Sequence, residues 1–208
     1  MFPKKPHVAM IVGQTCCGKS WFVMDLINGE YKNFFSVIMI ICPTFKHNET
    51  YKTHSDIFHY KCRNSQGTKI FFDDLKEGTA DPIDALEFYT RNFKGTNTLF
   101  ILDDLAEDQC MDKKRTALGK MAISGRHYKH SMWVITQKYN SINTQIRQQS
   151  QWICSFYCKS MKSFNDMLDD NEAGIKREDR SKILEHLKKE GGKLLLFCTP
   201  PNVCHRLV

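Results

Sequence analysis

Near its start the chain reads Gly13-Gln14-Thr15-Cys16-Cys17-Gly18-Lys19-Ser20, and this stretch decides the fold. It matches the pattern G-x-x-x-x-G-K-[ST], in which glycines let backbone N–H groups converge on phosphate oxygens. An apolar run, Val8 to Val12, precedes the loop, and a helix-like segment, Lys19 to Ile27, follows it. The loop would therefore lie at a helix N-terminus, which favours anions. A fortuitous glycine turn would lack this context, so the motif predicts a nucleotide-phosphate site.

The residues of this loop have separate expected roles. Lys19 would hold the β- and γ-phosphates of ATP, and the Ser20 hydroxyl would ligate Mg²⁺. ATP and Mg²⁺ are therefore the expected cofactors. The residues expected to bind the nucleotide are Gly13, Gln14, Thr15, Cys16, Cys17, Gly18, Lys19, Ser20 and Trp21.

Strand-like and helix-like segments alternate along the chain. The expected strands are Val8–Val12, Phe35–Ile41, Thr98–Leu102, Met132–Thr136, Trp152–Tyr157 and Leu194–Phe197. The expected helices are Lys19–Ile27, Pro82–Phe93, Lys113–Ser124, Ser141–Gln148 and Arg180–Lys189. Residues 44–68 are the least regular stretch and are expected to be a surface excursion. This order predicts an α/β fold with a central, mostly parallel sheet flanked by helices.

A second motif, which is acidic, follows an apolar strand. Leu99 to Leu102 leads into Asp103 and Asp104, as expected when a buried strand delivers acids to the edge of a sheet that also holds the phosphate loop. Asp103 would position Mg²⁺, and Asp104 would polarise the attacking water as general base, with Glu107 as the second candidate base. A plain turn or helix cap is the alternative interpretation of two adjacent acids.

Three further polar residues are candidates for catalysis. Gln137 follows the apolar strand that ends at Thr136, where it would sense the γ-phosphate or orient a water. Arg126 and Arg147 flank that strand, and either could stabilise charge on the transferring phosphoryl group as an arginine finger from a neighbouring subunit. The alternatives are an ordinary strand end for the glutamine and solvated side chains for the arginines.

Length and composition bound the class of protein. The 208 residues are the size of one domain, so residues 1–208 are expected to fold as a single unit. Lys and Arg number 30 against 23 for Asp and Glu, and the resulting charge of +7 favours a polyanionic partner such as nucleic acid without establishing one. The most apolar run, Phe34 to Cys42, is shorter than the roughly 18 residues of a membrane helix, so no membrane span is expected.

The nine cysteines indicate a reducing compartment. Their number is odd, and Cys42, Cys154, Cys158 and Cys198 fall in or beside expected core strands. We expect buried, reduced thiols and, because the start of the chain has no signal-peptide pattern, an intracellular location. Cys154 and Cys158 are expected to pack in the core, because no second close pair accompanies them to form a zinc site.

Taken in order, these motifs resemble the poxvirus-type genome-packaging ATPases of the FtsK/HerA superfamily, whose relatives occur in large DNA viruses, virophages and Polinton-like elements. The resemblance rests on Gly13–Ser20, Leu99–Asp104, Gly125-Arg126-His127 and Thr136-Gln137, and it covers about residues 7 to 160. It also takes in Cys42-Pro43-Thr44 and Ile142 to Arg147. The chain departs from the common pattern at Ile142-Asn143, where relatives often have Ile-Pro, and in Asp104, where many ATPases have Glu.

The resemblance implies a P-loop NTPase of the ASCE type that works as a DNA-translocating motor. It implies a homo-oligomeric ring, a pentamer or hexamer, that pumps double-stranded DNA into a preformed capsid and meets a capsid vertex or portal protein. Gln137 would be the sensor and Arg126 the finger acting in trans. The implied location is the host cytoplasm, in a virus factory, or the nucleus, with transient attachment to the capsid vertex.

Basic clusters give the DNA hypothesis limited support from the residues themselves. Lys113, Lys114 and Arg115 would touch phosphates, as would residues 126–130, although clusters of this size also occur on solvated helix faces. A small nucleoside or nucleotide kinase is the main alternative function, because such enzymes share the loop and the length. The paired Asp103-Asp104 and the sensor Gln137 favour water as the acceptor instead. A nucleotide-regulated scaffold without hydrolysis is the third hypothesis.

Overall fold

The computed structural model describes residues 2–42, 48–53, 69–73, 88, 90–103, 111–171, 174–199 and 204–208. Several expected features lie outside these ranges. They are Asp104, Glu107, Pro43-Thr44, most of residues 44–68 and most of the expected helix Pro82–Phe93, of which residues 88 and 90–92 are helical. The side chains of Lys113, Lys114 and Arg115 are also outside the described part.

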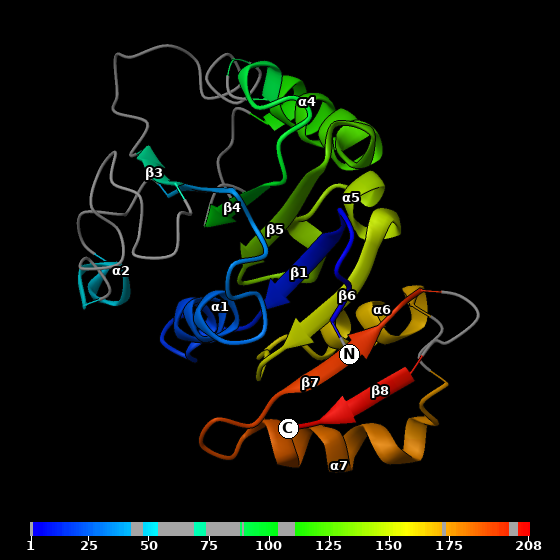
Figure 1. The fold of residues 1–208 in the computed structure, drawn as a ribbon. Coiled ribbons are helices and arrows are strands. Elements are labelled where there is room, and N and C mark those ends of the chain that lie inside the picture. The colour runs from blue at the N-terminus through cyan, green and yellow to red at the C-terminus, as the bar shows by residue number, and fades with distance from the viewer. Residues whose placement is uncertain are drawn as a thin grey trace.

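One sheet of eight strands runs through the described ranges, in the order β3-β2-β4-β5-β1-β6-β7-β8 (Figure 1). Its strands are β1 Val8–Val12, β2 Val37–Ile41, β3 Lys69–Asp73, β4 Thr98–Asp103, β5 His130–Thr136, β6 Ser150–Ser155, β7 Leu194–Phe197 and β8 Cys204–Leu207. The first six pair in parallel, and β7 and β8 are antiparallel to their neighbours. The mostly parallel sheet that the sequence predicts is therefore confirmed.

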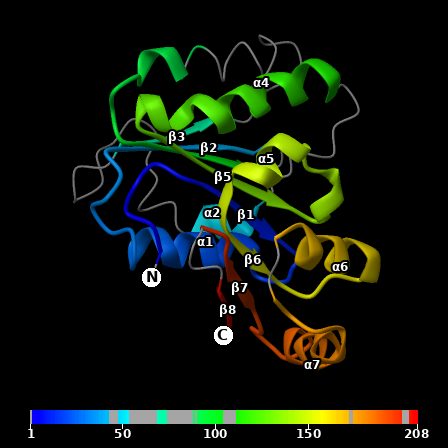
Figure 2. The same ribbon diagram turned by 90° about the vertical axis from the view of Figure 1, so that its right-hand side faces the viewer.

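Helices cover both faces of the sheet. The helices are α1 Lys19–Asn28, α2 Glu49–Thr53, α4 Met111–Ser124, α5 Thr144–Gln149, α6 Met161–Asp170 and α7 Arg177–Leu187, with short 3-10 turns η3 Gly125–Tyr128 and η4 Tyr139–Ser141. One core packs α1 and α2 on one face, and the other packs α4 to α7 on the opposite face. Figure 2 shows α4 and α5 on the far side of the sheet from α1. Burial on both faces explains why β1, β2, β4 and β5 are continuous apolar runs.

Because the six strands are parallel, all of them begin at one edge of the sheet and finish at the other. We call these the amino edge and the carboxyl edge. At the carboxyl edge β5 lies between β1, which leads into the phosphate loop, and β4, which ends in Asp103. This strand order brings both motifs of the sequence to one edge, as expected for the ASCE type.

The expected boundaries differ from the structure in places. The expected strand Trp152–Tyr157 runs instead from Ser150 to Ser155, and the expected helix Ser141–Gln148 is split into η4 and α5, because Asn143 caps α5 by accepting from the Gln145 N–H. Four elements were not predicted: α2, β3, α6 and β8. The short helix α2 lies within residues 44–68, so part of that stretch is packed on the core and is not a surface excursion.

The cysteines that the structure describes are free thiols, and Cys42, Cys154 and Cys158 are buried, whereas Cys198, which was also expected to be buried, is half-buried. Burial raises the pKa of the Cys158 thiol to about 11. In the ranges described above, no helix has both the length and the apolar character needed to cross a bilayer.

Candidate nucleotide site

The loop between β1 and α1 has the backbone shape that its glycines allow. Gly18 adopts a left-handed conformation with φ of 91°, which a residue with a Cβ rarely adopts. A Cβ on Gly13 would lie 2.6 Å from the Phe156 Cβ and 2.7 Å from the Cys17 Sγ, so only glycine fits there. The loop therefore curls back tightly and delivers the first N–H groups of α1 to its concave side, where the helix dipole also favours an anion.

Lys19 places its ammonium group against the start of this loop. Its Nζ donates to the carbonyl oxygens of Gly13, at 2.8 Å, and Gln14, at 2.6 Å, and the side chain is buried. Both partners are neutral carbonyls, so neither of them neutralises the charge of the ammonium group. The loop therefore carries a fixed positive charge at the place where a phosphate would lie.

Asp103, at the end of β4, faces the start of α1. Its Oδ2 lies 3.4 Å from the Ser20 Oγ, and the carboxylate is only 3% exposed. A hydroxyl and a carboxylate side by side are oxygen ligands of the kind that Mg²⁺ prefers. The residues present fit the metal that the motif implies: Ser20 would be a direct ligand, and Asp103 would act through water.

Tyr51 is a site residue that the sequence did not reveal. It lies in α2, is fully buried, and its hydroxyl donates to the Asp103 Oδ2 at 2.7 Å. Burial, and then the Asp103 charge, raise the pKa of Tyr51 well above its ordinary value, so the phenol stays protonated and can only donate to the carboxylate. The one available signal was a tyrosine within a polar stretch after β2, which by itself does not indicate a contact with Asp103.

Gln137 lies beside the phosphate loop. It directly follows Thr136, whose carbonyl accepts from the Gly13 N–H at 3.1 Å. With Gln14 and Thr15 it lines an open cavity of about 350 Å³, which also contacts the start of α6. This side chain can reach a group bound next to the loop.

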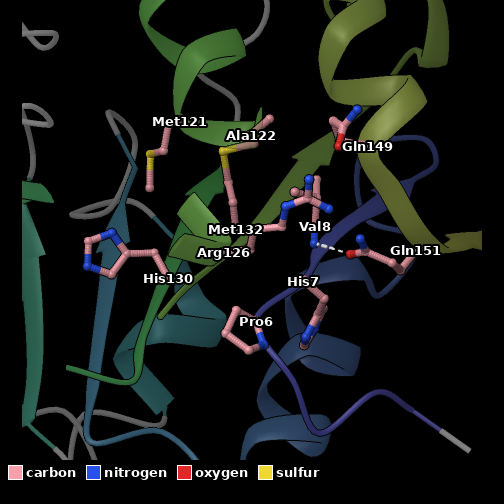
Figure 3. Close-up of a pocket in the computed structure, with 10 residues that line it drawn as sticks. All are labelled: Pro6, His7, Val8, Met121, Ala122, Arg126, His130, Met132, Gln149 and Gln151. Carbon is pink, nitrogen blue, oxygen red and sulfur yellow. Dashed lines mark hydrogen bonds between the residues drawn. The ribbon is translucent and has the colours of Figure 1, made fainter. Parts of the chain in front are cut away.

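Arg126 lies at the opposite edge of the sheet. It belongs to η3, which precedes β5, and it is exposed. Figure 3 shows Arg126 beside Val8 and Met132, the amino ends of β1 and β5, around a small cavity of about 10 Å³. The length of β5, roughly 20 Å, separates it from Gln137, so Arg126 is out of reach of the phosphate loop of its own chain.

Arg147 is engaged within its own subunit. In α5, it forms an ion pair with Asp170 of α6, its Nη2 donates to the Thr144 hydroxyl at 3.2 Å, and its guanidinium lies 5.0 Å from the centre of the Tyr139 ring. These contacts fix α5 to α6. Trp21, in the first turn of α1, is 48% exposed.

Comparisons with known proteins agree on one group. A family model described as "Poxvirus A32 protein" matches residues 2–194. The structure of the genome packaging NTPase B204 from Sulfolobus turreted icosahedral virus 2, in complex with ATP-gammaS, is 15% identical and aligns over 99% of this chain and 98% of that chain, with a TM-score of 0.63. B204 from Sulfolobus turreted icosahedral virus, a DNA-packaging ATPase, is 14% identical over 100% and 98% of the two chains, with a TM-score of 0.64.

A secretion ATPase has the same fold. The cytoplasmic domain of EccC, the Type VII secretion ATPase of Thermomonospora curvata, is 14% identical with a TM-score of 0.62, and the match covers 94% of this chain and 24% of that one. No curated protein matches the sequence. The similar structures are therefore P-loop ATPases, which confirms the fold that the motifs predict.

Proposed function

We propose that this chain, which belongs to the poxvirus A32 protein family, is an ATP-hydrolysing motor that packages double-stranded viral DNA into a preformed capsid. The observation that carries the proposal is the meeting of the Ser20 hydroxyl and the Asp103 carboxylate beside the glycine loop. Family membership supports packaging as the use of that site, and the B204 neighbours, themselves packaging NTPases, support it further.

The chain's own residues would divide the work of hydrolysis. Lys19 and the first N–H groups of α1 would bind the phosphates of ATP, and Gln137 would orient the attacking water. Bound Mg²⁺, held by Ser20 and by Asp103 through water, would neutralise phosphate charge. Asp104, with Glu107 as the second candidate, would accept the proton of that water as general base.

The active form would be a homo-oligomeric ring of five or six subunits, each one a single domain spanning residues 1–208. Since Arg126 is out of reach of its own loop, it would act on the nucleotide of the neighbouring subunit. Arg147, the other candidate finger, would serve mainly to hold α5 to α6. The ring would dock on a capsid vertex or portal protein in the host cytoplasm or nucleus, and Lys113, Lys114 and Arg115 are candidate contacts to DNA.

The kinase alternative has no support from the family or from the structural neighbours. We therefore expect ATP turnover to rise when double-stranded DNA is added. Lys19→Ala should remove nucleotide binding, because the loop loses its fixed charge, whereas Lys189→Ala, an exposed lysine in the loop after α7, should behave as wild type.

The measurements are phosphate release with and without DNA at low salt, and titration of each variant with a fluorescent ATP analogue. A rate that DNA leaves unchanged, together with phosphorylation of a nucleoside, would overturn the motor. Full nucleotide affinity in Lys19→Ala would overturn the site.

A further inference from the structure

A buried aromatic residue, Phe156, lies beside the phosphate loop although it belongs to a distant part of the sequence. It follows Ser155, the last residue of β6, at the carboxyl edge of the sheet. In the sheet, β6 is the neighbour of β1 on the side away from β5 (Figure 1). The end of β6 therefore meets the end of β1, where the phosphate loop begins.

The side chain of Phe156 packs against both glycines of the loop. A Cβ on Gly13 would lie 2.6 Å from the Phe156 Cβ, and a Cβ on Gly18 would lie 3.8 Å from its Cε1. The ring also meets Phe22, in the first turn of α1, edge to face, with ring centres 6.0 Å apart and planes at 77°. One side chain thus lies against the beginning of the loop, its end and the helix that follows.

The backbone around Phe156 holds the beginning of the loop as well. The Phe156 N–H donates to the Val12 carbonyl at 2.8 Å, and the Gln14 N–H donates to the Tyr157 carbonyl at 3.3 Å. These two bonds lie on either side of Gly13, whose own N–H donates to the last residue of β5 at 3.1 Å. The beginning of the loop is therefore fixed between β5 and the segment after β6.

The loop needs such support because its binding conformation is unfavourable while it is empty. The N–H groups that converge on the phosphate position and the Lys19 ammonium group beside them are all positive, so they repel one another until an anion binds. Cys16, with φ of 60°, and Gly18, with φ of 91°, are both left-handed, which is unfavourable for a cysteine. Without other contacts the empty loop would relax away from this conformation.

The loop's own residues supply little of that support. No side chain caps α1, and the side chains of Thr15 and Cys16 are exposed. Lys19 bonds to two loop carbonyls, but its ammonium group would leave them to reach a phosphate. Phe156, in contrast, presents an apolar ring and a backbone N–H that is bonded to β1. Its contacts do not compete with a phosphate, so they persist when the nucleotide binds.

We propose that Phe156 is a positioning residue that holds the phosphate loop in its binding conformation before the nucleotide arrives. The inference rests on the proposed nucleotide site and names a residue outside the motif on which that site depends. Phe156 acts through the loop and does not touch the reacting atoms. Loss of its ring therefore lowers the fraction of molecules that can bind phosphate and leaves the chemistry of the bound state intact.

The test compares two equivalent losses of a buried aromatic ring. Phe156→Leu removes the ring beside the loop. The control, Phe35→Leu, removes a ring that is equally buried and lies before β2, at the amino edge, among Tyr31 and Phe34. A third variant, Phe22→Leu, removes the edge-to-face partner of Phe156 at a half-buried position, where the fold is less at risk. The measurements are titration with a fluorescent ATP analogue, steady-state phosphate release and urea unfolding.

We expect Phe156→Leu to bind the analogue about 10- to 100-fold more weakly, as when the competent fraction falls to between about a tenth and a hundredth. The KM for ATP should rise by the same factor while kcat at saturation changes less than about 2-fold. Phe22→Leu should weaken binding about 2- to 10-fold. Phe35→Leu should keep the wild-type affinity and KM, whatever stability it loses.

The two kinetic constants separate positioning from a merely structural role. A lower kcat with unchanged KM in Phe156→Leu would overturn the proposal, because it indicates a smaller folded fraction with an intact loop. Equal affinity in Phe156→Leu and wild type would also overturn it. If urea unfolding shows that Phe156→Leu does not fold, Phe22→Leu decides, and wild-type affinity in that variant would refute the role of the ring. If wild type itself does not bind the analogue, the proposed nucleotide site fails, and this inference fails with it.

Discussion

At the level of single residues, Asp103 depends on two donors that approach one oxygen. Removing a carboxylate from water is costly unless hydrogen bonds replace the lost hydration. The Tyr51 hydroxyl supplies the shorter bond to Oδ2, and the Ser20 hydroxyl the longer. If Ser20 turned to ligate Mg²⁺, the Tyr51 hydroxyl would still donate to this oxygen. Tyr51 is therefore a positioning residue that acts through Asp103.

Tyr51→Phe keeps the buried ring and removes only the hydroxyl. A hydrogen bond to a charged group contributes about 1.5–3 kcal/mol, so we expect kcat for ATP hydrolysis to fall about 10- to 100-fold. The KM for ATP should change little, because the phosphate loop is untouched, and more Mg²⁺ should be needed for half-maximal rate. Tyr31→Phe is the control, since Tyr31 is equally buried and bonded but belongs to the other edge. Equal kinetics for both variants would contradict the positioning role.

His7 is a buried imidazole held neutral among aromatic rings. Its Nδ1 donates to the Lys5 carbonyl at 2.7 Å, and its Nε2 accepts from the Trp133 indole at 2.8 Å. These bonds attach the segment before β1 to β5. Burial lowers the pKa of His7 from 6.5 to about 4, so an unfolded chain takes up a proton at a pH where the folded chain does not.

The pH dependence of stability follows from that shift. The contribution of His7 is fully present above pH 6.5 and is lost as the pH falls toward 4, because protons then favour the unfolded state. Between about pH 7.5 and pH 5 the loss amounts to about 2 kcal/mol. Urea unfolding of wild type and of His7→Gln at both pH values measures it. The variant, less stable at pH 7.5, should lose about 2 kcal/mol less than wild type on acidification. If wild type and His7→Gln lost the same free energy of unfolding on acidification, groups other than His7 would cause the pH dependence of stability.

At the level of elements, patterns of apolar residues predicted the strands and helices that are most deeply buried in the core. β1 and β7 were predicted with their observed bounds because every residue of β1 is buried and a glycine pair precedes β7. Helix α1 was predicted to within one residue, since the phosphate motif marks where it begins. Two of the elements that were missed have weak patterns, since α2 is a single turn and β8 is exposed at every position. Helix α6, in contrast, buries Phe164, Met167 and Leu168 at helical spacing.

Site residues could likewise be predicted where they adjoin a strongly patterned element, and not where they lie in a weakly patterned one. Lys19, Ser20, Asp103 and Gln137 follow or open predicted elements, and the parallel order of the strands was enough to bring them together. The contact of Tyr51 with Asp103 joins positions 52 residues apart through a helix too short to show periodicity.

The close packing of α7 against β7 allows a test of an element. A Cβ on Gly192 would lie 2.2 Å from the His186 carbonyl oxygen, which is backbone and cannot rotate away. Gly192→Ala should therefore lower the free energy of unfolding by about 1–3 kcal/mol. Lys189→Ala, three residues earlier and exposed, should change it by less than about 0.5 kcal/mol. Urea unfolding compares the two, and an unchanged Gly192→Ala would show that α7 can shift freely against the sheet.

At the level of the whole molecule, the two edges of the sheet carry different chemistry. The carboxyl edge holds the glycine loop, Lys19 and Asp103, and the amino edge holds Arg126. Because both edges belong to one sheet, an arginine at the amino edge of one subunit meets a nucleotide only when subunits are arranged edge to edge. A ring provides this arrangement at every interface.

Arg126→Ala tests this geometry through mixed assemblies. If Arg126 acts on the neighbour's nucleotide, each variant subunit silences a site that is otherwise intact, so coordinated turnover should fall more steeply than the fraction of variant added. An arginine finger contributes about 10³- to 10⁵-fold to turnover, so the pure variant should be nearly inactive while still binding ATP. The measurement is DNA-stimulated phosphate release across a series of wild-type and variant mixtures of constant total concentration. A decline in strict proportion to the variant fraction would contradict an action of Arg126 on the neighbour's nucleotide. The edge-to-edge arrangement of subunits would then be wrong, because Arg126 is too far along β5 to act within its own subunit. The Lys19→Ala series provides the comparison, because that variant removes its own nucleotide and leaves its Arg126 available to the neighbour.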